Sequence, residues 1–359
     1  MRHKSFIQAG AIVAVSIAVL AAATPGVHAR SKNRPRPRPH KRHERVERGP
    51  KKDAQYRGKE EALSSYRAFS VRSYWNQPLP ANVPVDPNSK EIIGYLKADN
   101  DYNYIRLAGT SSTGTWGQPI YWAEAGDKVY SVSSTRYELP PEFSSLRIPR
   151  AARSDGSSDG AMVVYDLDKG YVAWLWQAVY DQAHDKWTAG GGGMTYLESN
   201  GLDRKWKHVE GTDSRNRGHR GVPAPVGAVR YDEVKGARAI NHVLKIGVNT
   251  TKAQAVFPMV GHEYGTNAAF APPEGTRLRI KRSVDLKSLP LSRDEFVVAK
   301  ALQTYGAVIG GQSGANVTLK VEHTIAEGRG YLWKGVLSSE SLESIPLDFF
   351  EVVRLGYES

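Results

Sequence analysis

Short segments in which apolar and polar residues alternate constrain the fold of this chain more than any other feature. The clearest of them cover residues 161–166, 171–176, 277–281 and 317–322. Each contains β-branched or aromatic residues and is flanked by turn-forming ones, which is the pattern of a β-strand. The turn-forming residues 168–170 between the first two predict a hairpin. The chain is therefore predicted to be mainly β.

Helical patterns are few. The best covers residues 293–305, where Ser292 suits the N-cap, Glu295 completes a capping box and Gly306 follows as a C-cap. Shorter helices are predicted over residues 91–97 and 226–234. Many strands, few helices and 34 Gly with 20 Pro favour a β-sandwich or jelly roll over alternating β-α-β units.

The N-terminal residues have the pattern of an export signal. Basic residues 2–4 precede an apolar run over residues 6–23, and residues 27–29 offer small side chains for cleavage. A membrane anchor is the alternative interpretation, but the run is short for a span and no second one follows. We therefore expect a signal peptide over residues 1–29 and a secreted mature chain without a transmembrane segment.

The positive charge is concentrated near the N-terminus. Of a net charge of +12, residues 1–52 hold 13 Lys and Arg against 2 Glu, which leaves 36 against 35 afterwards. Residues 30–63 begin with a Pro- and Arg-rich stretch and are predicted to form a disordered linker, with one β-sandwich-like domain over residues 64–359. The linker either holds the protein on an anionic surface, such as teichoic acid of the cell wall or phospholipid headgroups, or is a solvated spacer. Nucleic acid is not expected as a partner, because the folded part is nearly neutral.

Several chemistries are excluded by what the chain lacks. It contains no Cys, which rules out disulfides, thiolate metal sites and a cysteine nucleophile. The glycine run over residues 190–193 lacks the Lys-Ser/Thr ending of a phosphate-binding loop, and His262-Glu263 lacks the second His of a zinc hydrolase motif. We therefore expect neither a cofactor nor a metal.

Glu233 and His242 are the candidate catalytic residues. In a strand over residues 240–246, period two places His242 on the same face as the aliphatic residues 240, 244 and 246. An imidazole there can act as a general acid or base, and Glu233 in the preceding segment offers a carboxylate. A core histidine hydrogen-bonded to the backbone is the alternative.

Four further residues are candidates for substrate binding. Arg220 and His219 lie in a glycine-bracketed polar loop that suits an anionic or hydroxylated ligand. The 18 Tyr and 8 Trp against 8 Phe favour aromatic faces with a polar edge, of the kind that contact sugar rings. Trp187 beside the glycine run is the candidate for stacking, and Asn76 in the segment that opens the compact region is a further contact. Half-buried aromatics covering a sheet explain the same composition.

Motifs along most of the folded part resemble a known group of proteins. They are Gly221-Val222-Pro223, residues 229–233, residues 240–244, Pro258, residues 302–306 and residues 350–353, together with Trp187 and Asn200-Gly201. The chain resembles a group of secreted β-rich proteins of actinobacteria and other bacteria that has no established activity. The resemblance implies export, one folded unit and attention to Glu233 and His242. Gln177 and Ala178 stand where relatives are expected to carry a carboxylate, which weakens a two-carboxylate hydrolase.

These features predict a secreted carbohydrate-active protein, a polysaccharide hydrolase or lyase with a concave groove. Glu233 and His242 would be the acid and base, Arg220 would orient a uronate and Trp187 would stack on a ring. A lyase needs a base and a group that neutralises a carboxylate, whereas an inverting hydrolase needs two carboxyls about 6.5–9.5 Å apart. The alternative is a noncatalytic cell-wall-associated module that binds glycan or protein.

Overall fold

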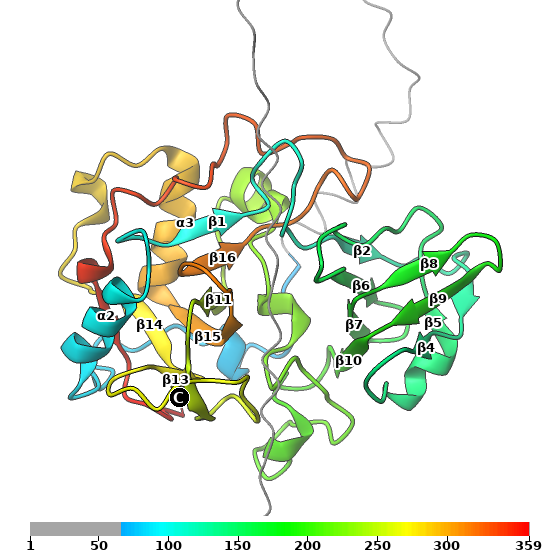
Figure 1. The fold of residues 1–359 in the computed structure, drawn as a ribbon, viewed down its shortest axis with the longest axis horizontal. Coiled ribbons are helices and arrows are strands. Elements are labelled where there is room, and N and C mark those ends of the chain that lie inside the picture. The colour runs from blue at the N-terminus through cyan, green and yellow to red at the C-terminus, as the bar shows by residue number, and fades with distance from the viewer. Residues whose placement is uncertain (1–65, 359) are drawn as a thin grey trace, which may run out of the picture. The chain divides into compact units, whose positions relative to one another are not determined.

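The computed structural model describes residues 66–358. The predicted signal peptide over residues 1–29 and the predicted linker over residues 30–63 lie outside the described residues. The described part is mainly β with few helices, as predicted, and its strands form several mixed sheets (Figure 1). No helix within residues 66–358 has the length and hydropathy needed to cross a membrane.

The largest sheet contains six strands. Their order is β1 (Arg106–Ala108), β16 (Thr318–Lys320), β11 (Leu244–Val248), β15 (Ala307–Gln312), β14 (Arg277–Ile280) and β17 (Phe350–Val352). Strand β11 pairs in parallel with β15 and antiparallel with β16. This mixed pairing differs from the antiparallel pairing that defines a jelly roll.

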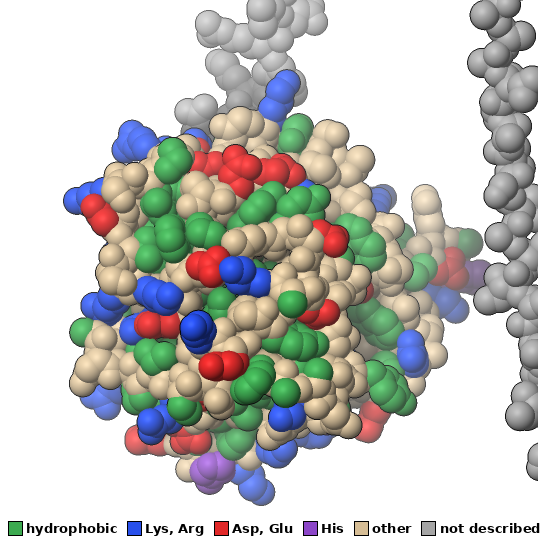
Figure 2. Space-filling model, turned by 60° about the vertical axis from the view of Figure 1, so that its left-hand side comes forward, with side chains coloured by type: hydrophobic (Ala, Val, Ile, Leu, Met, Phe, Trp, Pro, Cys, Tyr) green, Lys and Arg blue, Asp and Glu red, His purple; other side chains and the backbone are tan. Residues whose placement is uncertain are grey.

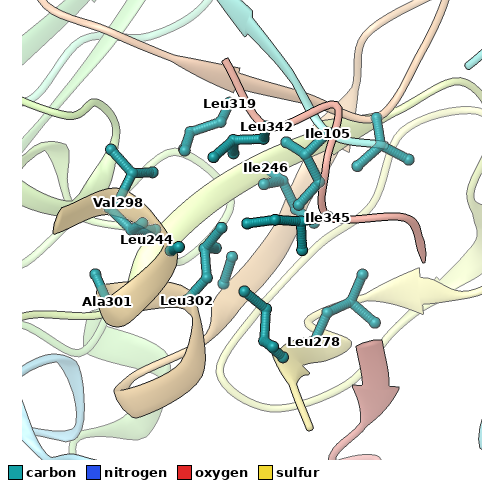
Figure 3. Close-up of a cluster of buried hydrophobic side chains, with 14 of the residues drawn as sticks. Ile105, Leu244, Ile246, Leu278, Val298, Ala301, Leu302, Leu319, Leu342 and Ile345 are labelled. Carbon is teal, nitrogen blue, oxygen red and sulfur yellow. The ribbon is translucent and has the colours of Figure 1, made fainter. Parts of the chain in front are cut away.

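One face of this sheet packs on the longest helix. Helix α3 (Arg293–Thr304) begins with the predicted capping box between Ser292 and Glu295. It buries Val298 and Leu302 against Leu244 and Ile246 of β11 (Figure 3). Each such fully buried aliphatic side chain stabilises the fold by about 1.5–3 kcal/mol. Because side chains alternate along a strand, Lys245 of β11 is on the opposite face.

The second sheet contains four strands. Their order is β10 (Gly191–Tyr196), β7 (Tyr171–Trp176), β6 (Met162–Asp166) and β2 (Ile120–Trp122). Strands β6 and β7 form the predicted hairpin. Both faces of β6 are buried, since Met162 and Val164 belong to one core cluster while Val163 and Tyr165 belong to another.

The remaining elements are small. They comprise a three-stranded sheet of β4 (Ser133–Ser134), β9 (Lys186–Ala189) and β8 (Val179–Asp181), the pairs β12 (Lys252–Ala255) with β13 (Pro273–Glu274) and β3 (Val129–Tyr130) with β5 (Leu146–Arg147), helix α2 (Ser89–Ala98), and the short helical turns η1 (Tyr74–Asn76), η2 (Pro141–Ser145), η3 (Arg204–Trp206), η4 (Ala224–Val226), η5 (Glu233–Ala237), η6 (Leu286–Ser288) and η7 (Leu347–Phe349).

A core cluster joins the two larger sheets. It contains Val308 of β15 together with Val163 of β6 and Val172 of β7. The face of the six-stranded sheet that carries Lys245 and Val308 therefore lies toward the four-stranded sheet. A lysine on this face is not simply a solvated surface residue, because a second layer of protein covers the strand.

Two local predictions need correction near the candidate site. The helix expected over residues 226–234 is replaced by η4 and η5, because backbone N–H groups of Arg230 and Tyr231 donate to the carboxylates of Glu233 and Glu322 rather than to helical carbonyls. The strand expected over residues 240–246 begins only at Leu244.

Charges are mixed on the face shown in Figure 2. Lys and Arg side chains are interspersed there with Asp and Glu among apolar side chains. This mixture agrees with the nearly balanced count of 36 basic and 35 acidic residues after residue 52.

Candidate functional site

Glu233 and His242 meet inside the protein. Glu233 begins the turn η5, His242 precedes β11, and the His242 Nε2 and Glu233 Oε1 atoms are 2.9 Å apart. The His242 Nδ1 atom lies 2.8 Å from the carbonyl oxygen of Val243. Both ring nitrogens therefore have protein partners, which leaves neither of them for a substrate.

A buried arginine, Arg230, favours the charged form of Glu233. Arg230 contacts Glu233 at 3.4 Å and Asp232 at 3.2 Å. Burial alone would raise the pKa of Glu233, but Arg230 and then His242 lower it below its ordinary value. Burial raises the pKa of Asp232 to about 6, with Arg230 opposing the shift.

Further carboxylates extend the network by binding backbone groups. Glu322 accepts hydrogen bonds from the Tyr231 N–H at 2.6 Å and from Arg329 at 2.7 Å. Glu327 accepts one from the Ile120 N–H at 2.7 Å and one from Arg329 at 3.2 Å. These contacts tie the turn after residue 229 to β2 and to the segment after β16.

The predicted catalytic pair is thus brought together but enclosed. Glu233 is 3% exposed and His242 is 8% exposed. The hydrogen bonds and ion pairs of both side chains are made with other groups of the protein. This geometry favours the structural alternative, in which the pair holds the loop in front of β11.

Two other residues predicted to bind substrate, Trp187 and Asn76, are buried. Trp187 is 3% exposed and packs in a hydrophobic cluster with Phe143 and Met194, so it has no free face for a sugar ring. Asn76 is 2% exposed, and its side-chain amide donates to the carbonyl oxygens of Ala68 and Ser70 at 2.6 and 3.0 Å. Neither of these residues lies where it can contact a substrate in this conformation.

Of the two remaining candidates, His219 contacts both Arg220 and a lysine that the sequence did not single out, Lys245. Arg220 Nη1 lies 3.1 Å from His219 Nε2, and Lys245 Nζ lies 3.2 Å from His219 Nδ1. The loop is held tightly, since His219 and Val222 exchange backbone hydrogen bonds and Arg220 has a φ of 50°. We call His219, Arg220, Lys245 and Lys320 the basic cluster.

The cations of this cluster disturb one another. Burial, followed by the like charge of Lys320, lowers the pKa of Lys245 to about 8. Burial and then the charges of Lys245 and Arg220 hold the pKa of His219 well below its ordinary value. At neutral pH the imidazole is therefore uncharged, and a fraction of Lys245 is a free amine.

Acidic side chains border the basic cluster, each with a partner of its own. Glu263 binds Arg220 at 2.5 Å and accepts the Gln312 N–H at 3.0 Å. Glu274 accepts the Glu263 N–H at 2.7 Å, and its Oε2 atom is buried without a hydrogen-bond partner among the described residues. Burial raises the pKa of Glu274.

Lys320 links the cluster to the four-stranded sheet. Its Nζ atom lies 2.9 Å from Asp159, whose side chain is 37% exposed. Burial alone would raise the pKa of Asp159, but Lys320 and Lys245 lower it overall. His219 in turn packs edge-on against Trp174 of β7, with ring centroids 5.2 Å apart. The cluster thus lies between the two larger sheets, and its four residues are partly exposed.

A hollow adjoins the loop that carries Arg220. It has a volume of about 560 Å³ and is lined by Asp203, Arg204, Lys205, Lys207, Ser214 and Val260. The Val260 N–H donates to the Arg220 carbonyl oxygen at 2.8 Å, which connects the hollow to the basic cluster. Three basic side chains in its lining favour an anionic ligand.

Sequence reasoning missed Lys245 for a definite reason. The pattern around His242 directed attention to the aliphatic face of β11, and Lys245 has the opposite orientation. A lysine that alternates with buried aliphatic residues is typical of a strand with one solvent-exposed face. Lys245 differs from such a lysine because the four-stranded sheet covers this face of β11.

Within residues 66–358, no group of three or more His, Asp and Glu side chains is arranged to hold a metal ion. The basic cluster itself offers amine, imidazole and guanidinium groups. No protein-family model, curated protein or solved structure matches this chain.

Proposed function

We propose that this chain is a secreted carbohydrate-active protein that cleaves acidic polysaccharide by β-elimination at the basic cluster. The supporting observation is the convergence of Lys245, His219 and Arg220 through contacts of 3.1 and 3.2 Å in a partly buried setting. We further propose that the two larger sheets are the layers of a β-sandwich and that the substrate lies along the opening between them.

The chemistry requires a base and a cation in the same place. In β-elimination a base removes the proton next to the uronate carboxylate, and the electron pair forms a carbon–carbon double bond. The glycosidic oxygen leaves and takes up a proton from the protonated base. Lys245 as a free amine is the base in this proposal, and the N–H groups of Arg220 and Lys320 that are not bonded to Glu263 and Asp159 bind the carboxylate. His219 stays neutral and orients the amine of Lys245.

A hydrolase fits this site less well. Glu263 is paired with Arg220, and Asp159 is paired with Lys320. Glu274 is fully buried. The carboxylates near the basic cluster thus already serve cations or the backbone, whereas an inverting hydrolase needs two that face the substrate.

Turnover of a polysaccharide panel tests this proposal. The protein is incubated with polygalacturonate, alginate, hyaluronan and neutral glucans, and products are followed by ultraviolet absorbance and by reducing ends. We expect unsaturated products from at least one acidic polymer and loss of at least 100-fold in rate for Lys245→Met. The exposed lysine variant Lys90→Met is the matched control and should retain the rate of the wild type.

Each alternative outcome contradicts part of the proposal. Reducing ends without ultraviolet absorbance would indicate hydrolysis and overturn the lyase. An unchanged rate for Lys245→Met would overturn the role of the basic cluster. Silence across the whole panel would overturn catalysis and favour the noncatalytic glycan- or protein-binding module.

Secretion and retention at the cell wall are part of the same proposal. This part is supported by the apolar N-terminal run and by residues 1–52, which contain 13 basic and 2 acidic residues. Fractionation of the producing cells should find the protein outside the cytoplasm, and moderate salt should release it from the wall. Unchanged wall association after deletion of residues 30–52 would contradict retention by the basic segment.

A further inference from the structure

A second hollow, with no charged residue in its described lining, lies beside β1. Its volume is about 400 Å³, within the range of roughly 300–1,000 Å³ that is usual for ligand pockets. It is lined by Leu107, Ala108, Gly109, Thr110, Ser111, Thr115, Trp116, Tyr331, Ser338 and Ser339. None of these described lining residues is charged, which distinguishes this hollow from the basic one.

Two aromatic rings of the lining are open to solvent. Trp116 is 44% exposed and Tyr331 is 38% exposed. The hydroxyl group of Tyr331 donates to the Thr110 carbonyl oxygen at 2.9 Å, which fixes the ring at the edge of the hollow. Such rings offer an apolar face to a ligand that also has polar edges.

The backbone at Trp116 is held in an unfavourable conformation. Its φ of 68° lies in the left-handed region, which costs a non-glycine residue about 1–2 kcal/mol. The strain does not serve core packing, because nearly half of the side chain is exposed. A strained residue whose large ring remains in water is typical of a binding site.

Hydroxyl groups form a chain along the same loop. Ser111 Oγ lies 2.9 Å from Thr113 Oγ1, which lies 2.8 Å from Thr115 Oγ1. Each hydroxyl can both donate and accept a hydrogen bond. The adjoining charge is already balanced, since Arg106, which donates to Ser339, is paired with Glu340 at 2.6 Å.

We propose that this hollow binds a neutral sugar, with the ring of one unit stacked on Trp116 and its hydroxyls on Ser111 and Thr115. Apolar rings beside uncharged hydroxyls match a pyranose, which has C–H faces bordered by groups that both donate and accept. A proline-rich peptide also stacks on aromatics, but it offers mainly carbonyl acceptors. The site goes beyond the proposed function, because it takes an uncharged ligand and needs no turnover.

Affinity electrophoresis of the full-length protein in gels containing hydroxyethylcellulose, β-mannan or soluble starch tests the proposal. At least one of these polymers should retard the wild type. The variant Trp116→Gly should weaken that binding at least about tenfold. Glycine accepts the left-handed backbone, so this variant removes the indole without adding strain to the fold.

Three further measurements complete the test. Thr115→Val should also weaken binding, while Tyr264→Ala, which removes a fully exposed aromatic elsewhere, should leave it unchanged. Lys245→Met should bind as the wild type does, which separates this site from the proposed lyase. Equal retardation of the wild type and Trp116→Gly, no retardation by any neutral polymer, or Trp116-dependent binding of a polyproline peptide alone would overturn the proposal.

Discussion

The Nζ atom of Lys245 lies 3.2 Å from Nδ1 of His219, whose other ring nitrogen lies 3.1 Å from the guanidinium of Arg220. A neutral imidazole has one accepting nitrogen, and Arg220 can only donate. Because the pKa of Lys245 is lowered to about 8, a fraction of this side chain is an uncharged amine at neutral pH. This arrangement places an amine near a permanent cation, which supports the lyase that we propose.

The acid stability of the protein should depend on His219. Its pKa lies well below the ordinary value of 6.5, because of burial and then the charges of Lys245 and Arg220. Between that lowered pKa and about 6.5 the unfolded chain binds a proton that the native state does not, so the free energy of unfolding falls as pH falls. We expect His219→Gln to flatten this decline in urea unfolding between pH 7 and 5.

The exposed histidine variant His208→Gln serves as its control and should keep the wild-type slope. A decline of the same steepness in His219→Gln and in the wild type would show that His219 is not held neutral.

Lys245 should make the stability of the protein depend on pH in the alkaline range. Its pKa is lowered from 10.5 to about 8, so between these values the unfolded chain binds more protons and native stability rises with pH. Removing the amine in Lys245→Met should stabilise the protein at pH 7 by on the order of 1–3 kcal/mol. This gain should shrink as pH rises from 8 to 10.5, as measured by thermal or urea unfolding.

Lys90→Met, at an exposed position of helix α2, should show no such pH dependence relative to the wild type. A stability difference for Lys245→Met that stays constant from pH 7 to 10.5 would contradict the lowered pKa.

Arg230 should be a major contributor to stability. Its guanidinium lies 3.2 Å from Asp232 and 3.4 Å from Glu233, and all three side chains are largely buried. Arg230→Met leaves buried carboxylates without their cation, which typically costs about 3–5 kcal/mol. Urea unfolding at pH 7 measures the loss.

Arg215→Met is the matched comparison. Arg215 binds Asp213 at 2.7 Å, but its side chain is 56% exposed. We expect a loss of at most about 1 kcal/mol there. Similar losses for the two variants would show that the buried network does not anchor the fold.

The glycine run should tolerate no side chain at Gly193. A Cβ atom there would lie 2.1 Å from the Arg217 carbonyl oxygen and 2.4 Å from Trp174 Nε1. Gly193→Ala should therefore destabilise the protein by about 1–3 kcal/mol or more, because β10 must move away from these groups.

Gly94 gives the opposite prediction. It lies in helix α2, and a Cβ atom there meets nothing within 4 Å. Gly94→Ala should stabilise the protein by about 0.5–1 kcal/mol through helix propensity. Thermal unfolding of both variants checks the pair, and a destabilised Gly94→Ala or an unaffected Gly193→Ala would contradict the packing described.

Local patterns were sufficient for much of the fold. The strands near residues 162–166, 171–176, 277–280 and 318–320 and the capped helix α3 follow from alternation and capping, which depend on neighbours in sequence. The structure of residues 226–243 could not be predicted from local patterns. There the backbone N–H of Arg230 donates to Glu233 and that of Tyr231 donates to Glu322, and such contacts leave no periodic pattern in the sequence.

The sequence by itself determined that this protein is mainly β, with one well-capped helix and a hairpin at residues 162–176, because these features depend on side-chain periodicity and local turn chemistry. Only the tertiary structure decided which charged residues are buried. It enclosed Glu233 and His242 in a satisfied network and brought Lys245 against His219 between two sheets. Burial and the proximity of other charges set the chemistry of a side chain, and both arise from segments far apart in sequence.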